Sequence, residues 1–381
     1  YFVGGMHDSL ISSLGRVSAL QVTSRTSARR VNTSRGIPQV GRTLGVANVV
    51  EGSVFRDGNL VRISIKLIDA ASDQHIWSET YEQPFDNVMA IQASVARSVA
   101  RVIEAHLTLV DEEQLARSLE IRPATFEAYL RAMFQFHKET QEGYQRGIEI
   151  LEDALANDPT GALAYAALGQ GYMELVHSLL PKSEAATRAK VAAEKALELD
   201  PTLAEAHLAK GLYQWYGEWD FEAGFASIDR ALELNPSLAD AWYHRAWFLE
   251  QFGDDDEAIV AGEKTVELSP LSNFYRGWLA EQYRDAGEYD KARKMAESVL
   301  SLNPNAPLSL FALGNIHLEQ GRYEEAIAAH EKIADLPFWS FAVGQTYAWA
   351  GQPDKALEVV QAIEHEIHYA LPLIIIYSAL G

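Results

Sequence analysis

A proline that returns about every 34 residues constrains the fold of this chain more than any other feature. Successive members of the series are separated by 42, 35, 34, 34 and 33 residues: Pro159, Pro201, Pro236, Pro270, Pro304 and Pro337. Most of them close a short phrase such as Glu-Leu-Asp-Pro or Glu-Leu-Asn-Pro. A fixed period of this length predicts stacked supersecondary units, each of which buries its apolar face against its neighbours.

Small residues recur in step with these prolines. Gly253, Gly287, Gly321 and Gly351 lie where the first helix of each unit would end. Glycine reaches the left-handed conformation of a helix C-cap without steric cost, and proline ends the second helix because it cannot continue one. The pattern predicts about seven helical hairpins from residue 123 onward, followed by one further helix at 369–380.

This repeat resembles that of the tetratricopeptide family, whose unit has 34 residues, small residues at fixed positions and a closing proline. The resemblance implies a mostly α protein in which residues 123–381 form a tetratricopeptide α-solenoid, a superhelix of antiparallel hairpins. It also implies that the first helices line a concave surface that binds protein or peptide ligands.

The first 120 residues follow a different period. Val61, Ile63, Ile65 and Leu67 alternate with polar residues, which is typical of a half-buried strand. We predict a small α/β domain with one mixed sheet over residues 1–120. Its strands would lie at 21–27, 47–55, 61–67 and 75–81, and its helices at 8–17, 38–44 and 86–107.

Short phrases in this region, Glu51-Gly52-Ser53-Val54 and Ile76-Trp77-Ser78-Glu79 among them, make it similar to the amino-terminal domain of the TolB family. That domain precedes tetratricopeptide repeats in many bacterial adenylate cyclases, serine/threonine kinases and winged-helix transcription regulators. The resemblance implies the sensory or regulatory region of a larger bacterial signalling protein. It also leads us to expect that the opening strand of the domain precedes Tyr1.

Charge and composition exclude several classes of function. The formal net charge is −21, and residues 121–381 carry 20 basic against 40 acidic side chains. Such a surface repels phosphate backbones, so we expect no nucleic-acid binding by this region. The absence of cysteine excludes disulfides, thiolate metal sites and cysteine nucleophiles. No apolar run reaches the ~20 residues of a membrane span, and the compartment stays open between the cytoplasm and a periplasmic location behind an anchor outside this chain.

Candidate chemistry is sparse. His365 and His368 lie three residues apart and could ligate a metal, with His330 as a third ligand from the preceding repeat. A metal-dependent hydrolase using these histidines is therefore the alternative function, although the His-Glu-x-x-His order of zinc hydrolases is missing. The simpler interpretation is a solvated helix face. We expect no catalytic residues and no cofactor in this chain, and any effector enzyme domain would lie upstream.

The tetratricopeptide resemblance points instead to a ligand groove, because fixed positions of the first helices face the concave surface in that family. The matching residues here are Leu208, Leu212, Trp215, Tyr243, Trp247, Glu250, Phe274, Glu281, Arg284, Phe311, Asn315, Phe341 and Gln345. The alternative for any one aromatic is packing between hairpins. Family grooves that clamp a carboxylate use Lys and Asn, and only Asn315 matches. We therefore predict a protein or peptide ligand with apolar anchors and basic flanks, and leave homo-oligomerisation open.

Overall fold

The computed structural model describes residues 2–117, 122–136, 140–175, 182–336, 339–363 and 370–380. The chain forms two compact units. Unit 1 comprises residues 1–245 and 267–270, and unit 2 comprises residues 246–266 and 271–381. Unit 1 therefore combines the sheet with the first helical hairpins. The division near residue 120 stays a prediction.

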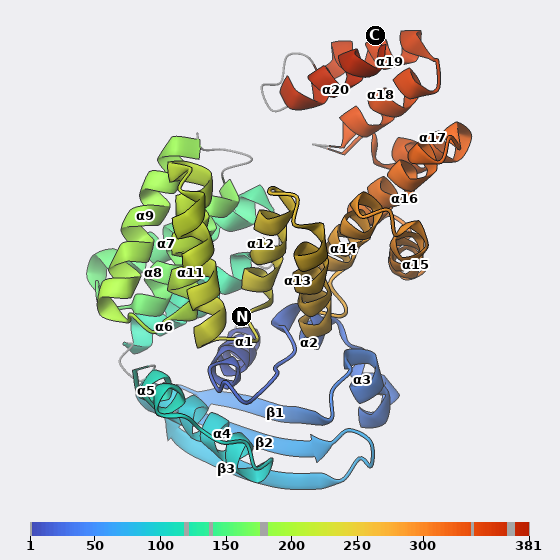
Figure 1. Ribbon diagram of the computed structural model, residues 1–381. Coiled ribbons are helices and arrows are strands. Elements are labelled where there is room, and N and C mark those ends of the chain that lie inside the picture. Colours follow the sequence, from blue (N-terminus) through green and yellow to red (C-terminus); the bar gives the residue numbers. More distant parts are fainter. Residues whose placement is uncertain are drawn as a thin grey trace. The chain divides into compact units, whose positions relative to one another are not determined.

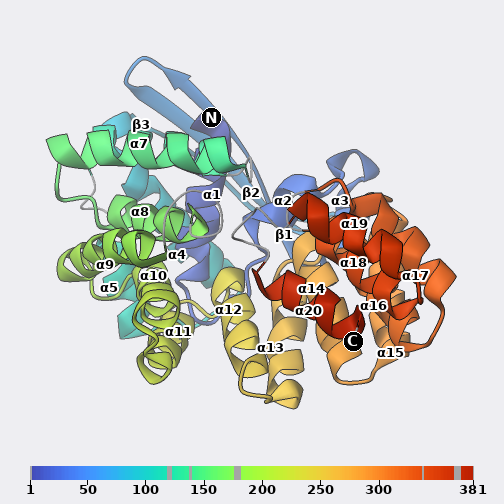
Figure 2. The ribbon, with the colours of Figure 1, turned by 90° about the horizontal axis from the view of Figure 1, so that it is seen from above.

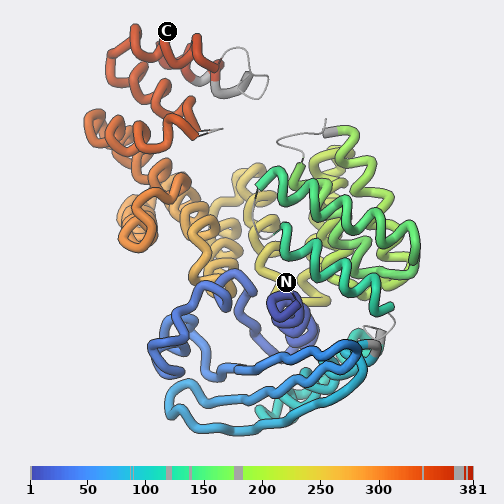
Figure 3. Tube along the Cα trace, turned by 180° about the vertical axis from the view of Figure 1, so that it is seen from behind, coloured from blue at the N-terminus to red at the C-terminus, as the bar shows by residue number. Residues whose placement is uncertain are grey.

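The sheet of unit 1 consists of three antiparallel strands in the order β1-β2-β3 (Figures 1 and 3). They are β1 (Asn48–Asp57), β2 (Leu60–Asp69) and β3 (His75–Pro84). Val61, Ile63, Ile65 and Leu67 of β2 are all buried, so the predicted alternation is confirmed. The β1–β2 turn contains Gly58 at φ +57°, a conformation that glycine adopts readily.

Two expectations for the sheet were wrong. Every pairing in the described sheet is antiparallel, so the sheet is not mixed. Residues 21–27 form no strand: residues 21–24 have no regular secondary structure, and helix α2 (Arg25–Arg30) follows them. The physical reason is that backbone N–H groups of this segment find other partners. Val22 donates to the Ser237 hydroxyl at 2.9 Å, and Ser24 donates to the Leu268 carbonyl at 2.7 Å.

Helices flank the sheet within unit 1. The helix predicted at 8–17 begins earlier, and the one predicted at 86–107 is shorter because Glu104 takes a φ of +58°. A Cβ on Gly5 would lie 2.7 Å from the Leu130 side chain, so glycine permits close packing there. The elements are α1 (Phe2–Gly15), η1 (Thr33–Arg35), α3 (Ile37–Leu44), η2 (Phe85–Asn87), α4 (Val88–Val102) and α5 (Leu109–Arg117).

The remaining helices of unit 1 are antiparallel pairs that pack side by side (Figure 2). Helix α10 contacts three neighbours, because α8, α9 and α11 all pack against it. The elements are α6 (Pro123–Phe136), α7 (Gln141–Asn157), α8 (Ala162–Glu174), α9 (Lys182–Leu199), α10 (Ala204–Tyr213), the π-helical turn η5 (Gln214–Glu218), α11 (Phe221–Leu234) and α12 (Ala239–Glu250), whose last turn belongs to unit 2.

Unit 2 continues the same arrangement. Its elements are α13 (Asp255–Leu268), α14 (Asn273–Asp285), α15 (Tyr289–Leu300), α16 (Pro307–Glu319), α17 (Tyr323–His330), η6 (Glu331–Ile333), α18 (Ser340–Trp349), α19 (Pro353–Ile363) and α20 (Ala370–Leu380). Counted along the described residues from Pro123, seven helix pairs and one further helix follow one another, as predicted. In the same residues no helix has both the length and the apolar character needed to cross a bilayer.

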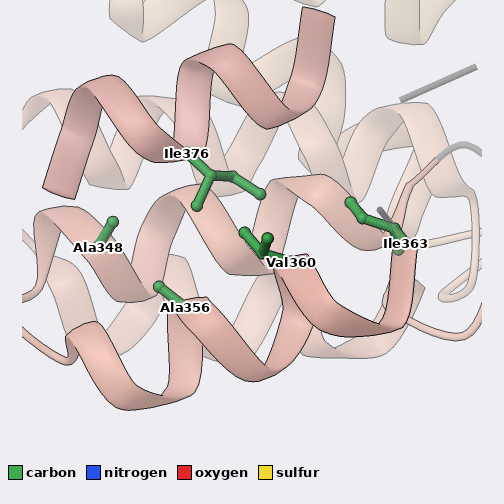
Figure 4. Close-up of a cluster of buried hydrophobic side chains, with 5 residues drawn as sticks. All are labelled: Ala348, Ala356, Val360, Ile363 and Ile376. Carbon is green, nitrogen blue, oxygen red and sulfur yellow. The ribbon is translucent and has the colours of Figure 1, made fainter. Parts of the chain in front are cut away.

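The predicted helix ends are confirmed in unit 2. Gly253, Gly287, Gly321 and Gly351 have φ values of +78°, +76°, +70° and +70°, the left-handed region that glycine favours. Small and branched residues fill the spaces between helices. Figure 4 shows the cluster that joins α18, α19 and α20, formed by Ala348, Ala356, Val360, Ile363 and Ile376.

Replacing Gly314 with alanine is expected to destabilise unit 2. A Cβ at this position would overlap the buried imidazole of His330. Overpacking of this kind costs about 1–3 kcal/mol, which urea unfolding would measure. Gly4→Ala is the matched control, because its Cβ would meet only the Arg29 guanidinium at 3.8 Å. A Gly314→Ala variant as stable as the parent would contradict this packing.

Candidate ligand-binding surface

The predicted groove residues on α10 and η5 are buried. Leu208, Leu212 and Trp215 are 2, 4 and 5% exposed. Trp215 packs edge-on against Phe221 and Phe225, with ring centroids 4.7 and 5.5 Å apart. The cause is that α9 and α11 pack against both α10 and η5, which leaves these side chains almost no contact with solvent. We therefore leave these three residues out of the proposed surface.

Tyr243 is the last predicted groove residue within unit 1. Its ring is half-buried and lies 4.8 Å from the imidazole of His244. Burial lowers the pKa of His244 to about 4, so this imidazole is neutral at physiological pH. Tyr243 therefore borders an uncharged aromatic neighbour.

The remaining predicted residues belong to unit 2, where the aromatic ones form two groups. In the first group, the ring centroid of Trp247 lies 4.9 Å from that of Trp278, and the ring centroid of Phe274 lies 6.5 Å from that of Trp278. Phe274 is 49% exposed, and Trp247 is half-buried. An aromatic pair of this kind presents a large apolar area with one polar atom on each indole.

The second aromatic group surrounds Phe311 on α16. Its ring lies 5.2 Å from that of Trp339 and 5.9 Å from that of Phe341. All three side chains are half-buried. The two groups thus leave partly accessible aromatic surface on α12, α14, α16 and α18, the first helices of successive hairpins.

The polar residues of the predicted surface form a network between α14 and α16. The Asn315 amide donates to Glu281 Oε2 at 3.1 Å, and Arg284 Nη2 donates to the same oxygen at 3.0 Å. Arg284 Nη1 also donates to Glu319 Oε1 at 2.5 Å. Glu281 and Asn315 are 7 and 8% exposed, so this network is largely desolvated. Gln345, on α18, is half-buried.

Two carboxyl groups here have strongly perturbed acidity. Burial raises the pKa of Glu281 to about 7, although the neighbouring Arg284 opposes the shift. Burial, followed by repulsion from Asp285, raises the pKa of Glu250 to about 7. Both groups therefore change charge near neutral pH, which is unusual for glutamate and frequent at functional sites.

Of the three histidines proposed as metal ligands, the structure describes only His330. His365 and His368 lie outside the described residues. His330 is 1% exposed, its Nδ1 lies 2.7 Å from Thr346 Oγ1, and its Nε2 lies 3.2 Å from the Phe311 carbonyl oxygen. Among the residues described, no group of three or more His, Asp or Glu could hold a metal ion.

Unit 1 contains a cavity of about 280 Å³ that sequence reasoning missed. It lies between α1, α4 and the strands β1 and β2, and its lining is mostly apolar. His7, Arg29 and Gln92 contribute polar groups, and Arg29 lies 3.9 Å from the buried carboxylate of Asp8. No periodic signal in the sequence marks such a space.

Sequence reasoning also missed residues that complete the surface of unit 2. Trp278 lies three residues before Glu281, as Trp247 lies three residues before Glu250, so the repeat itself carried a signal for it. Asp285 and Glu319 were missed as partners of Arg284, at 2.8 and 2.5 Å. Trp339 precedes α18 and follows no helical period.

Family models match three segments of the chain. Tetratricopeptide repeat models match residues 228–260 and 279–337. A model of the second domain of HilA/YgeH-like transcriptional regulators matches residues 3–98. This match agrees with the regulator setting expected for the amino-terminal region.

Relatives and solved structures resemble parts of the chain. Putative adenylate cyclase 3 of Rhizobium meliloti is 31% identical over 172 residues, which are 44% of this chain and 29% of that protein. Tetratricopeptide repeat protein 37 of Xenopus laevis is 25% identical over 226 residues, 58% of this chain and 14% of that protein. The chain thus spans less than a third of either relative.

Among solved structures, the Cut9–Hcn1 hetero-tetramer of the APC/C is similar over 77% of this chain and 66% of its own, with 15% identity and a TM-score of 0.49. The family-model matches identify tetratricopeptide repeats within residues 228–260 and 279–337. The chain is mostly α, contains tetratricopeptide repeats, and carries before them a small sheet region similar to a domain of transcriptional regulators.

Proposed function

We propose that this chain is a non-catalytic scaffold that binds a protein or peptide segment, and that it serves as the regulatory region of a larger bacterial signalling protein. The observation that carries the proposal is the partly exposed aromatic surface of unit 2. Phe274 is 49% exposed and stacks on Trp278, which in turn packs against Trp247, and such a surface offers apolar anchor sites.

The proposed regulatory role rests on the proteins and domains in which similar sequences occur. The relative named putative adenylate cyclase aligns with this chain over 172 residues, of which 31% are identical. The amino-terminal region resembles a domain of transcriptional regulators. An effector domain of either class would lie outside this chain, and the repeats would couple ligand binding to it.

The ligand suited to this surface is a segment with apolar side chains. A bare carboxylate is a poor ligand, because Glu250 and Glu281 follow the two indoles by three residues, one helical turn, on α12 and α14. Arg284 already pairs with three carboxylates, so burying a further anion there would cost several kcal/mol, by order of magnitude. We therefore expect internal segments rather than acidic carboxyl termini to bind.

Replacing Trp247 with alanine is expected to lower the affinity for every bound segment by about 30-fold. Aromatic hot spots at an interface contribute roughly 2 kcal/mol or more to the free energy of binding. The measurement is a peptide-array screen with the whole chain, followed by fluorescence anisotropy on the best peptides. Trp349→Ala is the matched control, since this indole is 56% exposed at the end of α18.

Two outcomes would refute the assignment of this surface. Acidic C-terminal peptides could dominate the array, or the Trp247→Ala variant could bind its peptides as tightly as the parent. Circular dichroism of both variants distinguishes lost binding from lost structure.

A further inference from the structure

We propose that the carboxyl ends of α12, α14 and α16 form a docking site for an arginine side chain of the bound segment. This inference rests on the proposed function and specifies its ligand. The site consists of Glu250, Asp255, Glu281, Asp285 and Glu319, referred to as the acidic cluster, with Arg284 among them. All six residues belong to unit 2.

The placement of three of these acids is unfavourable for the helices that carry them. Glu250 is the last residue of α12, Asp285 is the last residue of α14, and Glu319 is the last residue of α16. The carboxyl end of a helix carries partial negative charge, so a carboxylate there is unfavourable and a cation is favourable. Three successive first helices therefore share a feature that costs stability and that a bound cation would relieve.

Arg284, the cation already present, does not pair with every carboxylate oxygen of the acidic cluster. Arg284 contacts Glu281, Asp285 and Glu319 at 3.0, 2.8 and 2.5 Å, so one guanidinium is shared by three carboxylates. Glu250 Oε2 and Glu281 Oε1 are buried and have no hydrogen-bond partner within the described residues, although the Gln282 amide near Glu250 partly offsets the rise in the pKa of that carboxyl group. Glu281 is 7% exposed, so its free oxygen is an unpaired acceptor inside the protein.

The raised pKa values of Glu250 and Glu281 agree with this geometry, because both reflect desolvated carboxyl groups that lack sufficient positive charge nearby. Asp285 and Glu319 have side chains 37 and 36% exposed. These two acids are the accessible members of the cluster, and a cation of the ligand would meet them first.

The neighbouring indoles favour arginine over lysine. Trp247 lies three residues before Glu250, and Trp278 lies three residues before Glu281, so each indole is one helical turn from an acid. The two indoles lie 4.9 Å apart. A planar guanidinium can stack on an aromatic face while it donates two hydrogen bonds to a carboxylate, whereas an ammonium cannot do both as well.

The test uses the whole chain and a panel of labelled decapeptides with two leucine anchors at varied spacing. Each peptide carries arginine, lysine, glutamate or citrulline at one central position, citrulline being the neutral isostere of arginine. Glu250→Gln is expected to weaken the arginine peptides about tenfold and to leave the citrulline peptides within about twofold. Glu281→Gln, checked by thermal melting, provides a second variant for the deeper oxygen.

The control is Glu324→Gln, which removes an exposed acid of α17 in the same unit and is expected to change the affinity for arginine peptides by less than about twofold. The proposal is overturned if citrulline peptides bind as tightly as arginine peptides, or if Glu324→Gln has the same effect as Glu250→Gln. In either case the proposed function stands provided that Trp247→Ala still weakens all peptides. If the parent binds no peptide of the panel, both inferences fail.

Discussion

Replacing Phe248 with alanine is expected to lower the free energy of unfolding of unit 2 by about 3–5 kcal/mol, the usual cost of removing a fully buried phenyl ring. Phe248 is 0% exposed in the last turn of α12 that belongs to unit 2. The loss combines the transfer free energy of the ring with the cavity that it leaves, since helices held at both ends can collapse only partly.

Hydrogen exchange of the amides in α14 is the measurement, because it reports the stability of unit 2 separately from that of unit 1. Phe252→Ala is the matched control: the same side chain, one turn further along the chain, is 56% exposed. The control should change stability by less than about 0.5 kcal/mol. Equal effects of the two substitutions would show that Phe248 is not part of the core.

Features that depend on a local repeat could be predicted from the sequence. The glycines that end the first helices of unit 2 have the left-handed φ that their position required, and the helix pairs follow in the predicted order. The strand at 60–69 likewise shows the alternation of buried and exposed residues that its sequence indicated. Each of these depends on a few neighbouring residues and on a single period.

Features that depend on distant partners could not. The strand predicted at 21–27 is absent, because the backbone N–H groups of Val22 and Ser24 donate to Ser237 and Leu268, more than 200 residues away. The position of Trp215 in the repeat suggested a groove, but the burial of this indole follows from Phe221 and Phe225 of the next helix. Family positions identify which face a residue is on, whereas exposure is decided by how many helices cover that face.

The acidic cluster lies between these two cases. Glu281 and Asn315 are 34 residues apart and occupy equivalent positions in successive repeats, so their hydrogen bond could have been suspected from the period. The three ion pairs of Arg284 follow only from the three-dimensional structure, because no sequence period relates all of its carboxylate partners. Sequence alone treated these residues as separate parts of a groove.

The stability of unit 2 is expected to depend on pH through several buried groups, of which His330 and Glu281 make opposing contributions of about 3 kcal/mol each. Glu250, whose pKa burial also raises to about 7, acts in the same direction as Glu281 in the parent and in both variants. Burial lowers the pKa of His330 from 6.5 to about 4. Between these pH values the His330 imidazole is protonated in the unfolded chain and neutral in the folded chain. The contribution of His330 is therefore fully present above pH 6.5 and is lost as the pH falls through 4.

Glu281 acts in the opposite direction. Burial raises its pKa from 4.5 to about 7, so the folded chain keeps a proton that the unfolded chain has released. Its contribution is present below pH 4.5 and is lost as the pH rises through 7. Between pH 4.5 and 6.5 the two effects offset each other, and the parent should show only a shallow dependence on pH from this pair.

Single substitutions are expected to expose each contribution. Glu281→Gln removes the contribution of the Glu281 carboxyl group and leaves the contribution of the His330 imidazole. This variant should therefore lose stability on acidification from pH 6.5 to 4.5 relative to the parent. His330→Gln should do the reverse and gain stability relative to the parent over the same interval, whatever its absolute stability. Urea unfolding at four or five pH values measures both differences. Parallel profiles for the parent and both variants would mean that neither buried group titrates as its surroundings require, and that the unpaired oxygen of Glu281 has found a cation or a solvent path in solution.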